Sequence, residues 1–129
     1  MHYTPDVFDK DCPSQKVLSR IADKWAALII CALYEHKVMR NGELMRKIGG
    51  INQKMLTQSL RNLEMDGLIT RKIYPSVPPK VEYTLTKLGR GVYGPLNEIC
   101  IWTEAHLEEL KKIWASRIGK KENKLQQRA

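Results

Sequence analysis

Two adjacent glycines at positions 49–50 separate a short predicted helix from a longer one, and no other feature constrains the fold of this chain as strongly. Asn41 is a good N-cap for a helix over 42–48, and glycine ends a helix cheaply because it tolerates the left-handed conformation. A second helix is predicted over 52–66, where its first residue, an asparagine, caps it and Gly67 ends it. This order is typical of a helix-turn-helix.

Two short strands are predicted directly after the second helix. The segment 68–74 is a strand candidate, and 81–85 alternates apolar and polar residues with the period of a strand. Three of the residues over 75–80 between them are prolines, which lack the amide donor of regular structure. The order helix, helix, strand, wing and strand predicts an α+β, mainly α fold, namely a winged helix-turn-helix.

The rest of the chain is predicted to be helical. Ser14 is expected to cap a short helix that reaches about residue 23, and the ten apolar residues over 25–34 favour a buried central helix. Those ten residues are too few to span a membrane, which needs about 20. Thr86 is expected to cap a last helical region, in which apolar residues recur at helical spacing from Leu96 to Trp114.

These elements suggest three parts of the chain. We expect a leader over 1–13, a winged-helix domain with its last helix over 14–116, and a basic polar tail over 117–129 that is frayed. The leader has neither a basic start nor an apolar stretch, so we expect no secretory signal and a cytoplasmic location.

The formal charge of +8 is unevenly distributed along the chain. The segment 37–90 carries a net +7 and the segment 111–129 a net +6, whereas 1–36 carries −1 and 91–110 carries −4. A basic patch favours a polyanion such as DNA, RNA or an anionic membrane, although a solvated basic surface has the same composition. The acidic run in 91–110 either keeps that helix away from DNA or is an ordinary exposed face.

The second helix of the motif has the side chains that a DNA-reading helix needs. On a helical wheel three leucines cluster on one side, and polar or basic residues lie on the other. The predicted base-reading residues are Gln53, Lys54, Thr57, Gln58 and Arg61. Lys, Arg and Gln can reach base edges in the major groove, although they are also ordinary solvent-facing helix formers. Phosphate contacts are predicted for Arg40, Arg46 and Lys47 on the preceding helix and for Arg71, Lys72 and Lys80 around the wing.

The sequence resembles the HxlR-type winged helix-turn-helix regulators of bacteria and archaea over roughly residues 12–115. The resemblance is carried by Cys12-Pro13, Lys24-Trp25, Glu43-Leu44, Gly50-Ile51, Lys54-Met55-Leu56-Thr57, Leu60-Arg61, Leu63-Glu64, Gly67-Leu68-Ile69, Arg71, Pro78-Pro79-Lys80-Val81-Glu82-Tyr83, Leu85-Thr86 and Gly89. Two departures are Asn41, where the family commonly has an aromatic residue, and Ala22-Asp23, where it tends to have small residues. We expect neither departure to touch the DNA-facing surface.

The resemblance implies a homodimer in which the first and last helices pack across a two-fold axis. The expected dimerisation residues are Val17, Leu18, Ile99, Trp102, Leu110 and Ile113. It also implies that two recognition helices enter successive major grooves of an imperfect palindrome in double-stranded DNA, with repression as the commoner outcome.

Three widely spaced cysteines predict neither a disulfide framework nor a zinc site. Some members of the family sense oxidants or electrophiles through a cysteine at the position of Cys12. A helix N-terminus favours a reactive thiolate, whereas Asp9 and Asp11 oppose it, so Cys12 is either a redox sensor or a buried structural residue. Cys31 and Cys100 are expected to pack.

No enzyme is expected, because the three histidines are scattered and no catalytic constellation or glycine-rich phosphate loop is present. We expect no cofactor and no metal. An alternative to a DNA regulator is a winged-helix module that binds RNA or a protein partner without base specificity. Binding of the basic tail to a membrane surface would require an apolar face that the tail lacks.

Overall fold

The computed structural model describes residue 6 and residues 8–127, with side chains described as far as residue 119. Residues 1–5 and 7 of the expected leader and residues 128–129 of the expected tail lie outside the described residues. The chain divides into two compact units, Met1–Leu96 and Asn97–Ala129, which are considered in turn. The predicted boundaries of leader, domain and tail stay a prediction.

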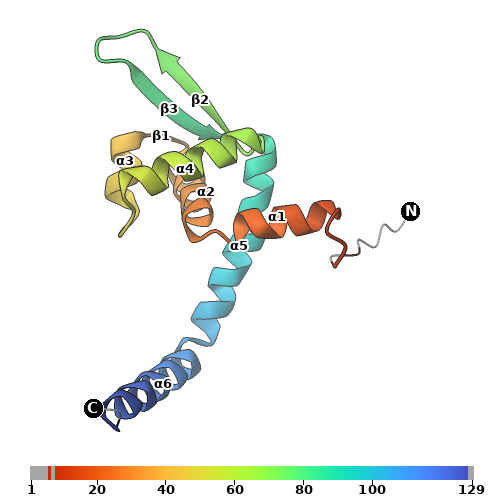
Figure 1. Cartoon of the computed structure of the whole chain (residues 1–129). Helices are drawn as coiled ribbons and strands as arrows, with labels where there is room; N and C mark the ends of the chain where they lie inside the picture. Colours follow the sequence, from red (N-terminus) through yellow and green to blue (C-terminus); the bar gives the residue numbers. More distant parts are fainter. Residues whose placement is uncertain (1–5, 7, 128–129) are drawn as a thin grey trace. The chain divides into compact units, whose positions relative to one another are not determined.

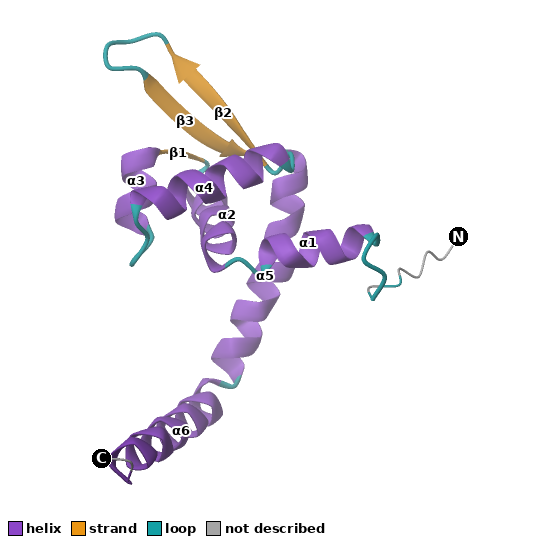
Figure 2. Ribbon diagram, viewed as in Figure 1, coloured by secondary structure: helices purple, strands orange, loops and turns teal. Residues whose placement is uncertain are grey.

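The first unit is a winged helix-turn-helix (Figures 1 and 2). Its elements are α1 (Pro13–Ile21), α2 (Lys24–His36), β1 (Val38–Arg40), α3 (Asn41–Lys47), α4 (Gln53–Met65), β2 (Ile69–Tyr74), β3 (Lys80–Leu85) and the first part of α5 (Lys87–Ala105). The β2–β3 hairpin extends away from α2, α3 and α4 (Figure 1). The predicted mainly helical α+β class is therefore confirmed.

Helix α2 is the centre of the core, as its apolar sequence predicts. Asp23 caps it by accepting a hydrogen bond from the backbone N–H of Trp25 at 3.0 Å. Its buried side chains pack with those of α3, α4 and the sheet. Among the described residues, the fully buried large side chains are Ile29, Ile30, Leu33, Leu44, Leu56, Leu63 and Ile69. Because burying one such side chain stabilises a fold by about 1.5–3 kcal/mol, this cluster fixes α4 on α2.

The sheet has three antiparallel strands in the order β1-β3-β2. Sequence reasoning missed β1, which has only three residues and shows a single alternation. Met39 lies opposite Tyr83 of β3 and is buried, whereas its neighbours Val38 and Arg40 are exposed. The strand β1 therefore closes the sheet over the core and places Arg40 directly before α3.

Two predicted N-caps are wrong by one or two residues. Pro13, not Ser14, opens α1, because the fixed φ of proline suits the first helical position and Cys12 takes the cap position. Asn41 is the first residue of α3 rather than its cap. Arg40 is the cap residue, and its backbone N–H donates to Glu43 Oε1 at 3.0 Å. The side chain of Asn41 is thus free for a different contact.

The end of α4 is joined to the start of α5 by Thr86, which caps α5 as predicted. Its Oγ1 accepts from the N–H of Gly89 at 3.1 Å and donates to the carbonyl of Gly67 at 2.6 Å. Gly67, with φ +74°, turns the chain from α4 into β2. A Cβ on Gly89 would lie 2.1 Å from the carbonyl oxygen of Leu68, so a glycine is required there.

The second unit contains the end of α5 and helix α6 (Leu107–Gln127). The last helical region of the sequence is two helices, which are divided at His106. The expectation that the chain frays beyond Ser116 is wrong for the described backbone, because α6 continues to Gln127. Lysine, glutamine and arginine are the most frequent residues of this last stretch, and all three are good helix formers.

Candidate nucleic-acid interface

Helix α4 begins at a turn that its sequence determines. Gly50 adopts φ +82°, and Asn52 caps α4 by accepting from the N–H of Met55 at 2.8 Å. The predicted inward face is confirmed, since Leu56, Leu60 and Leu63 are all buried. The orientation of α4 about its own axis is therefore fixed by the core.

The opposite face of α4 carries the predicted base-reading side chains. Gln53, Lys54, Gln58 and Arg61 are exposed, and Thr57 is half-buried. Lys54 and Arg61 form no hydrogen bond or ion pair with any described residue, whereas Gln58 donates a long hydrogen bond of 3.5 Å to Asn62. The structure thus brings all five residues to one accessible surface, and their role as base readers stays a prediction.

Gln53 is held in place by a polar network that sequence reasoning missed. Asn41 Nδ2 donates to Gln53 Oε1 at 2.7 Å, and Gln53 Nε2 donates back to Asn41 Oδ1 at 2.9 Å. Gln53 Nε2 also donates to Thr57 Oγ1 at 2.9 Å. The expectation that Asn41 does not touch the DNA-facing surface is therefore wrong, because this residue binds a side chain of that surface. Two carboxamides 12 residues apart give no periodic signal in a sequence.

Three of the six predicted phosphate-contacting residues form ion pairs within the chain. Arg40 lies 3.7 Å from Glu82, Lys47 lies 3.6 Å from Glu35, and Arg71 lies 3.6 Å from Glu64. All three basic side chains are exposed, and exposed pairs contribute only about 0–1 kcal/mol. Such weak pairs leave their basic partners free to exchange to a phosphate.

The two basic residues at the centre of β2 lie on opposite faces of the wing. Arg71 pairs in register with Tyr83 and faces α4, whereas Lys72 pairs with Glu82 on the other face. The ammonium of Lys72 lies 4.9 Å from the ring centroid of Tyr74, whose hydroxyl donates to Glu82 at 3.2 Å. Only one of these two residues therefore shares a surface with α4.

Tyr83 closes the junction between α4 and the wing. It lines a small cavity of about 120 Å³ together with Asn41, Thr57, Leu60, Arg61, Glu64 and Arg71. Burial raises the pKa of Tyr83 above its ordinary value because it disfavours the phenolate. The positive charge of Arg71 opposes this shift and the carboxylate of Glu64 adds to it. Tyr83 therefore remains a neutral hydrogen-bonding group at neutral pH.

The residues predicted to form a dimer interface expose apolar surface. Val17 and Leu18 on α1 are 50% and 52% exposed, and Ile99, Trp102 and Ile113 are also exposed. Leu110 is half-buried. The structure contains a single chain, so their role in dimerisation stays a prediction.

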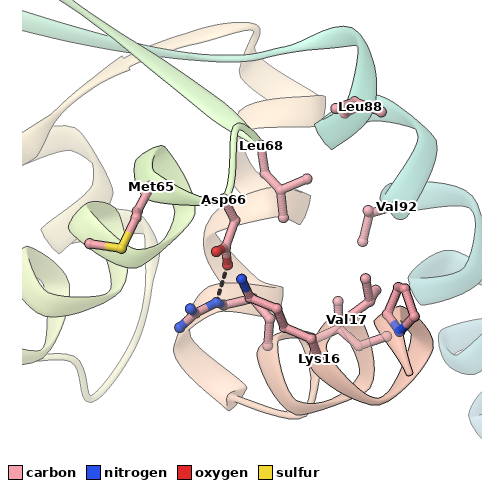
Figure 3. A pocket seen from close by; sticks show the side chains of 10 residues that line it. Lys16, Val17, Met65, Asp66, Leu68, Leu88 and Val92 are labelled. Atoms are coloured by element: carbon pink, nitrogen blue, oxygen red, sulfur yellow. Dashed lines mark hydrogen bonds and ion pairs between the residues drawn. The ribbon is translucent and has the colours of Figure 1, made fainter. Parts of the chain in front are cut away.

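A largely apolar hollow of about 470 Å³ lies between α1, the end of α4 and the start of α5 (Figure 3). Val17, Leu68, Leu88 and Val92 line it, and the ion pair between Arg20 Nε and Asp66 Oδ2 lies at its edge. Asp66 is the C-cap residue of α4. This ion pair therefore ties α1 to the end of the helix that carries the candidate interface.

The three cysteines lie in different environments. Cys12 is 7% exposed at the N-terminus of α1, Cys31 lies half-buried against the core, and Cys100 is exposed. Among the described residues, no three His, Cys, Asp or Glu side chains come together in a way that could hold a metal ion. Within the same residues, no helix has the length and apolarity to cross a membrane.

A family model described as HxlR-like helix-turn-helix matches residues 20–111. The chain is 45% identical over 108 residues to an uncharacterized HTH-type transcriptional regulator, YtfH of Escherichia coli, and the match covers 84% of this chain and 85% of YtfH. A solved structure of a YtfH regulator from Salmonella typhimurium is 40% identical, with a TM-score of 0.75, and covers 84% of this chain and 96% of that one. A structure of the redox regulator HypR in its oxidized form is 37% identical, with a TM-score of 0.66 and coverage of 73% and 96%.

Proposed function

Because the chain belongs to the HxlR-like helix-turn-helix family, whose matched members are transcriptional regulators and not enzymes, we propose that it is a homodimeric repressor that reads an imperfect palindrome in double-stranded DNA. The observation that carries this proposal is the outward face of α4. It displays two amides and two basic side chains, beginning at a capped helix N-terminus, and these side chains suit base edges in the major groove.

The charges around α4 support a polyanionic partner. Arg46 and Lys80 are exposed and have no ion pair within the described part of the chain. A dimer doubles such contacts, and with about 6–10 phosphate contacts the affinity should fall by about 10³–10⁵-fold between 50 and 200 mM salt. A dimer that binds across a promoter in the cytoplasm would exclude RNA polymerase and so repress transcription.

The proposal is tested by selecting bound duplexes from a randomised double-stranded DNA pool at physiological salt. We expect a two-fold symmetric motif with half-sites about one helical turn apart. Equal affinity for unrelated duplexes, or a preference for RNA, would contradict the proposal and favour the module without base specificity. A promoter-reporter fusion that carries the selected motif then distinguishes repression from activation.

Arg61→Ala tests the role of α4 directly. If Arg61 reads a base, this variant should lose about 1–3 kcal/mol of affinity and relax the preference at one position of each half-site. Arg117→Ala removes the same charge from an exposed position of the second unit and should leave every base preference intact. A loss that is uniform over all sequences would make Arg61 a phosphate contact instead.

Regulation through Cys12 is a second part of the proposal, supported by its position at the start of α1 and by the similarity to the redox regulator HypR. The burial of Cys12 is typical of a packing residue, so the experiment must separate sensing from packing. If Cys12 senses oxidants, Cys12→Ser should retain DNA affinity and lose the response to diamide, whereas Cys100→Ser should retain both. A Cys12→Ser variant that still responds would exclude Cys12 as the sensor.

A further inference from the structure

The reciprocal amide pair between Asn41 and Gln53 joins the first residue of α3 to the first residue of α4. Both backbones are fixed at this point, since Glu43 caps the start of α3 and Asn52 caps the start of α4. Asn41 is half-buried, whereas Gln53 is exposed on the candidate interface. Asn41 is therefore a half-buried support for a side chain that faces outward.

A count of hydrogen-bonding groups shows what Gln53 has left to offer. A carboxamide has two N–H donors and a carbonyl oxygen with two lone pairs. Nε2 of Gln53 uses one hydrogen on Asn41 Oδ1 and the other on Thr57 Oγ1. Oε1 uses one lone pair to accept from Asn41 Nδ2. One acceptor lone pair on Oε1 remains, and no donor remains.

The remaining acceptor lone pair on Gln53 Oε1 distinguishes bases that present a donor from bases that present only acceptors. In the major groove, cytosine presents its N4 amino donor and adenine its N6 amino donor, whereas guanine N7 and O6 and thymine O4 are acceptors. An acceptor that faces guanine or thymine would be left without a partner, which disfavours those bases. A free glutamine would instead hold adenine with two hydrogen bonds, to N6 and N7.

We propose that Asn41 is a specificity-determining positioning residue, which restricts Gln53 to accepting one hydrogen bond from the amino group of cytosine or adenine. This inference rests on the proposed function, because it needs Gln53 to face a base. The network also orders the Gln53 side chain before DNA arrives, so less side-chain entropy is lost on binding.

The test measures base preference rather than affinity, since preference is not moved by a uniform loss of binding. For each protein, four synthetic duplexes compete for binding. They differ only at the symmetric pair of positions at which Gln53→Ala loses its base preference. The wild-type chain should favour cytosine and adenine over guanine and thymine at that position by about fivefold to tenfold.

Three variants change the hydrogen-bonding groups of Gln53 in different directions. Asn41→Leu keeps the size of the side chain but frees a donor and an acceptor on Gln53, so the preference should move to adenine over cytosine by about tenfold. Asn41→Ala removes the same carboxamide with a smaller side chain and should move the preference the same way, which covers an Asn41→Leu variant that fails to fold. Gln53→Glu has acceptors only, so it should bind more weakly but keep the wild-type order of bases.

The outcomes separate this inference from the proposed function. A wild-type chain that selects no motif contradicts the proposed function itself. A chain that selects a motif, but whose base preferences are unchanged in both Asn41→Leu and Asn41→Ala, overturns only the role of Asn41. A reversed order of bases in Gln53→Glu, or a Gln53→Ala variant that keeps every preference, overturns it as well.

Discussion

The two units of this chain differ in the burial of their apolar side chains. The winged-helix unit buries leucine and isoleucine completely between α2, α4 and the sheet. In the second unit no described side chain is buried, and Trp102 and Trp114 are 53% and 51% exposed. The first unit therefore contains the core that stabilises it, whereas the second presents an apolar surface that a single chain leaves open to water. Helix α1 resembles the second unit in this respect, since none of its residues is buried.

The largest expected effect tests how tightly the first unit is packed. Gly89→Ala would place a Cβ 2.1 Å from the backbone carbonyl of Leu68, and neither backbone can move without opening the core. We expect a loss of more than about 3 kcal/mol in the free energy of unfolding, measured by urea denaturation. Gly91→Ala is the matched control in the same helix, where nothing lies within 4 Å, and it should stabilise by about 0.5–1 kcal/mol. Equal effects of the two changes would contradict the close contact.

A smaller effect is expected at the exposed surface of the second unit, and it should appear in association rather than in folding. Trp102→Ala removes a large aromatic side chain from the predicted dimer interface, where such residues commonly contribute about 2 kcal/mol or more. Sedimentation equilibrium should show a dissociation constant raised by at least about tenfold. Glu104→Ala changes a neighbouring exposed residue of α5 and should leave that constant nearly unchanged. A wild-type chain that is monomeric at all concentrations would remove dimerisation from the proposed function.

The contrast between the units also explains what the sequence could predict. An unbroken apolar run identified α2, and a periodic apolar pattern identified the two faces of α4. Asparagine and glycine identified the boundaries of α4, because all these signals are local. Strand β1 is too short to show a period. The contact of Asn41 with Gln53 depends on which elements the fold brings together, and so does the choice of Arg71 rather than Lys72 to face α4. No local pattern carries that information.

An effect of about 1 kcal/mol is expected for the ion pair that ties α1 to the end of α4 within the first unit. Both partners are partly buried, with side chains of Arg20 and Asp66 exposed by 25% and 17%. A double-mutant cycle with Arg20→Gln and Asp66→Asn should give an interaction energy near 1 kcal/mol, measured by thermal or urea unfolding. Arg20→Gln should also weaken DNA binding if α1 helps to position α4. An interaction energy of zero would mean that α1 is held by apolar contacts alone.

The smallest expected effect concerns Tyr83, at the junction where the buried core of the first unit meets its exposed interface. Burial raises the pKa of Tyr83 above the ordinary value of 10.0, so the folded state holds the phenolic proton more tightly than the unfolded chain does. The corresponding stabilisation is fully present below pH 10.0 and is lost as the pH rises through the higher folded-state pKa. The difference in unfolding free energy between the wild type and Tyr83→Phe should therefore be constant from pH 7 to pH 9 and shrink above pH 10. A difference that grows above pH 9 would mean that the charge of Arg71 outweighs burial. A difference that stays constant at every pH would mean that this junction behaves as exposed surface rather than as core.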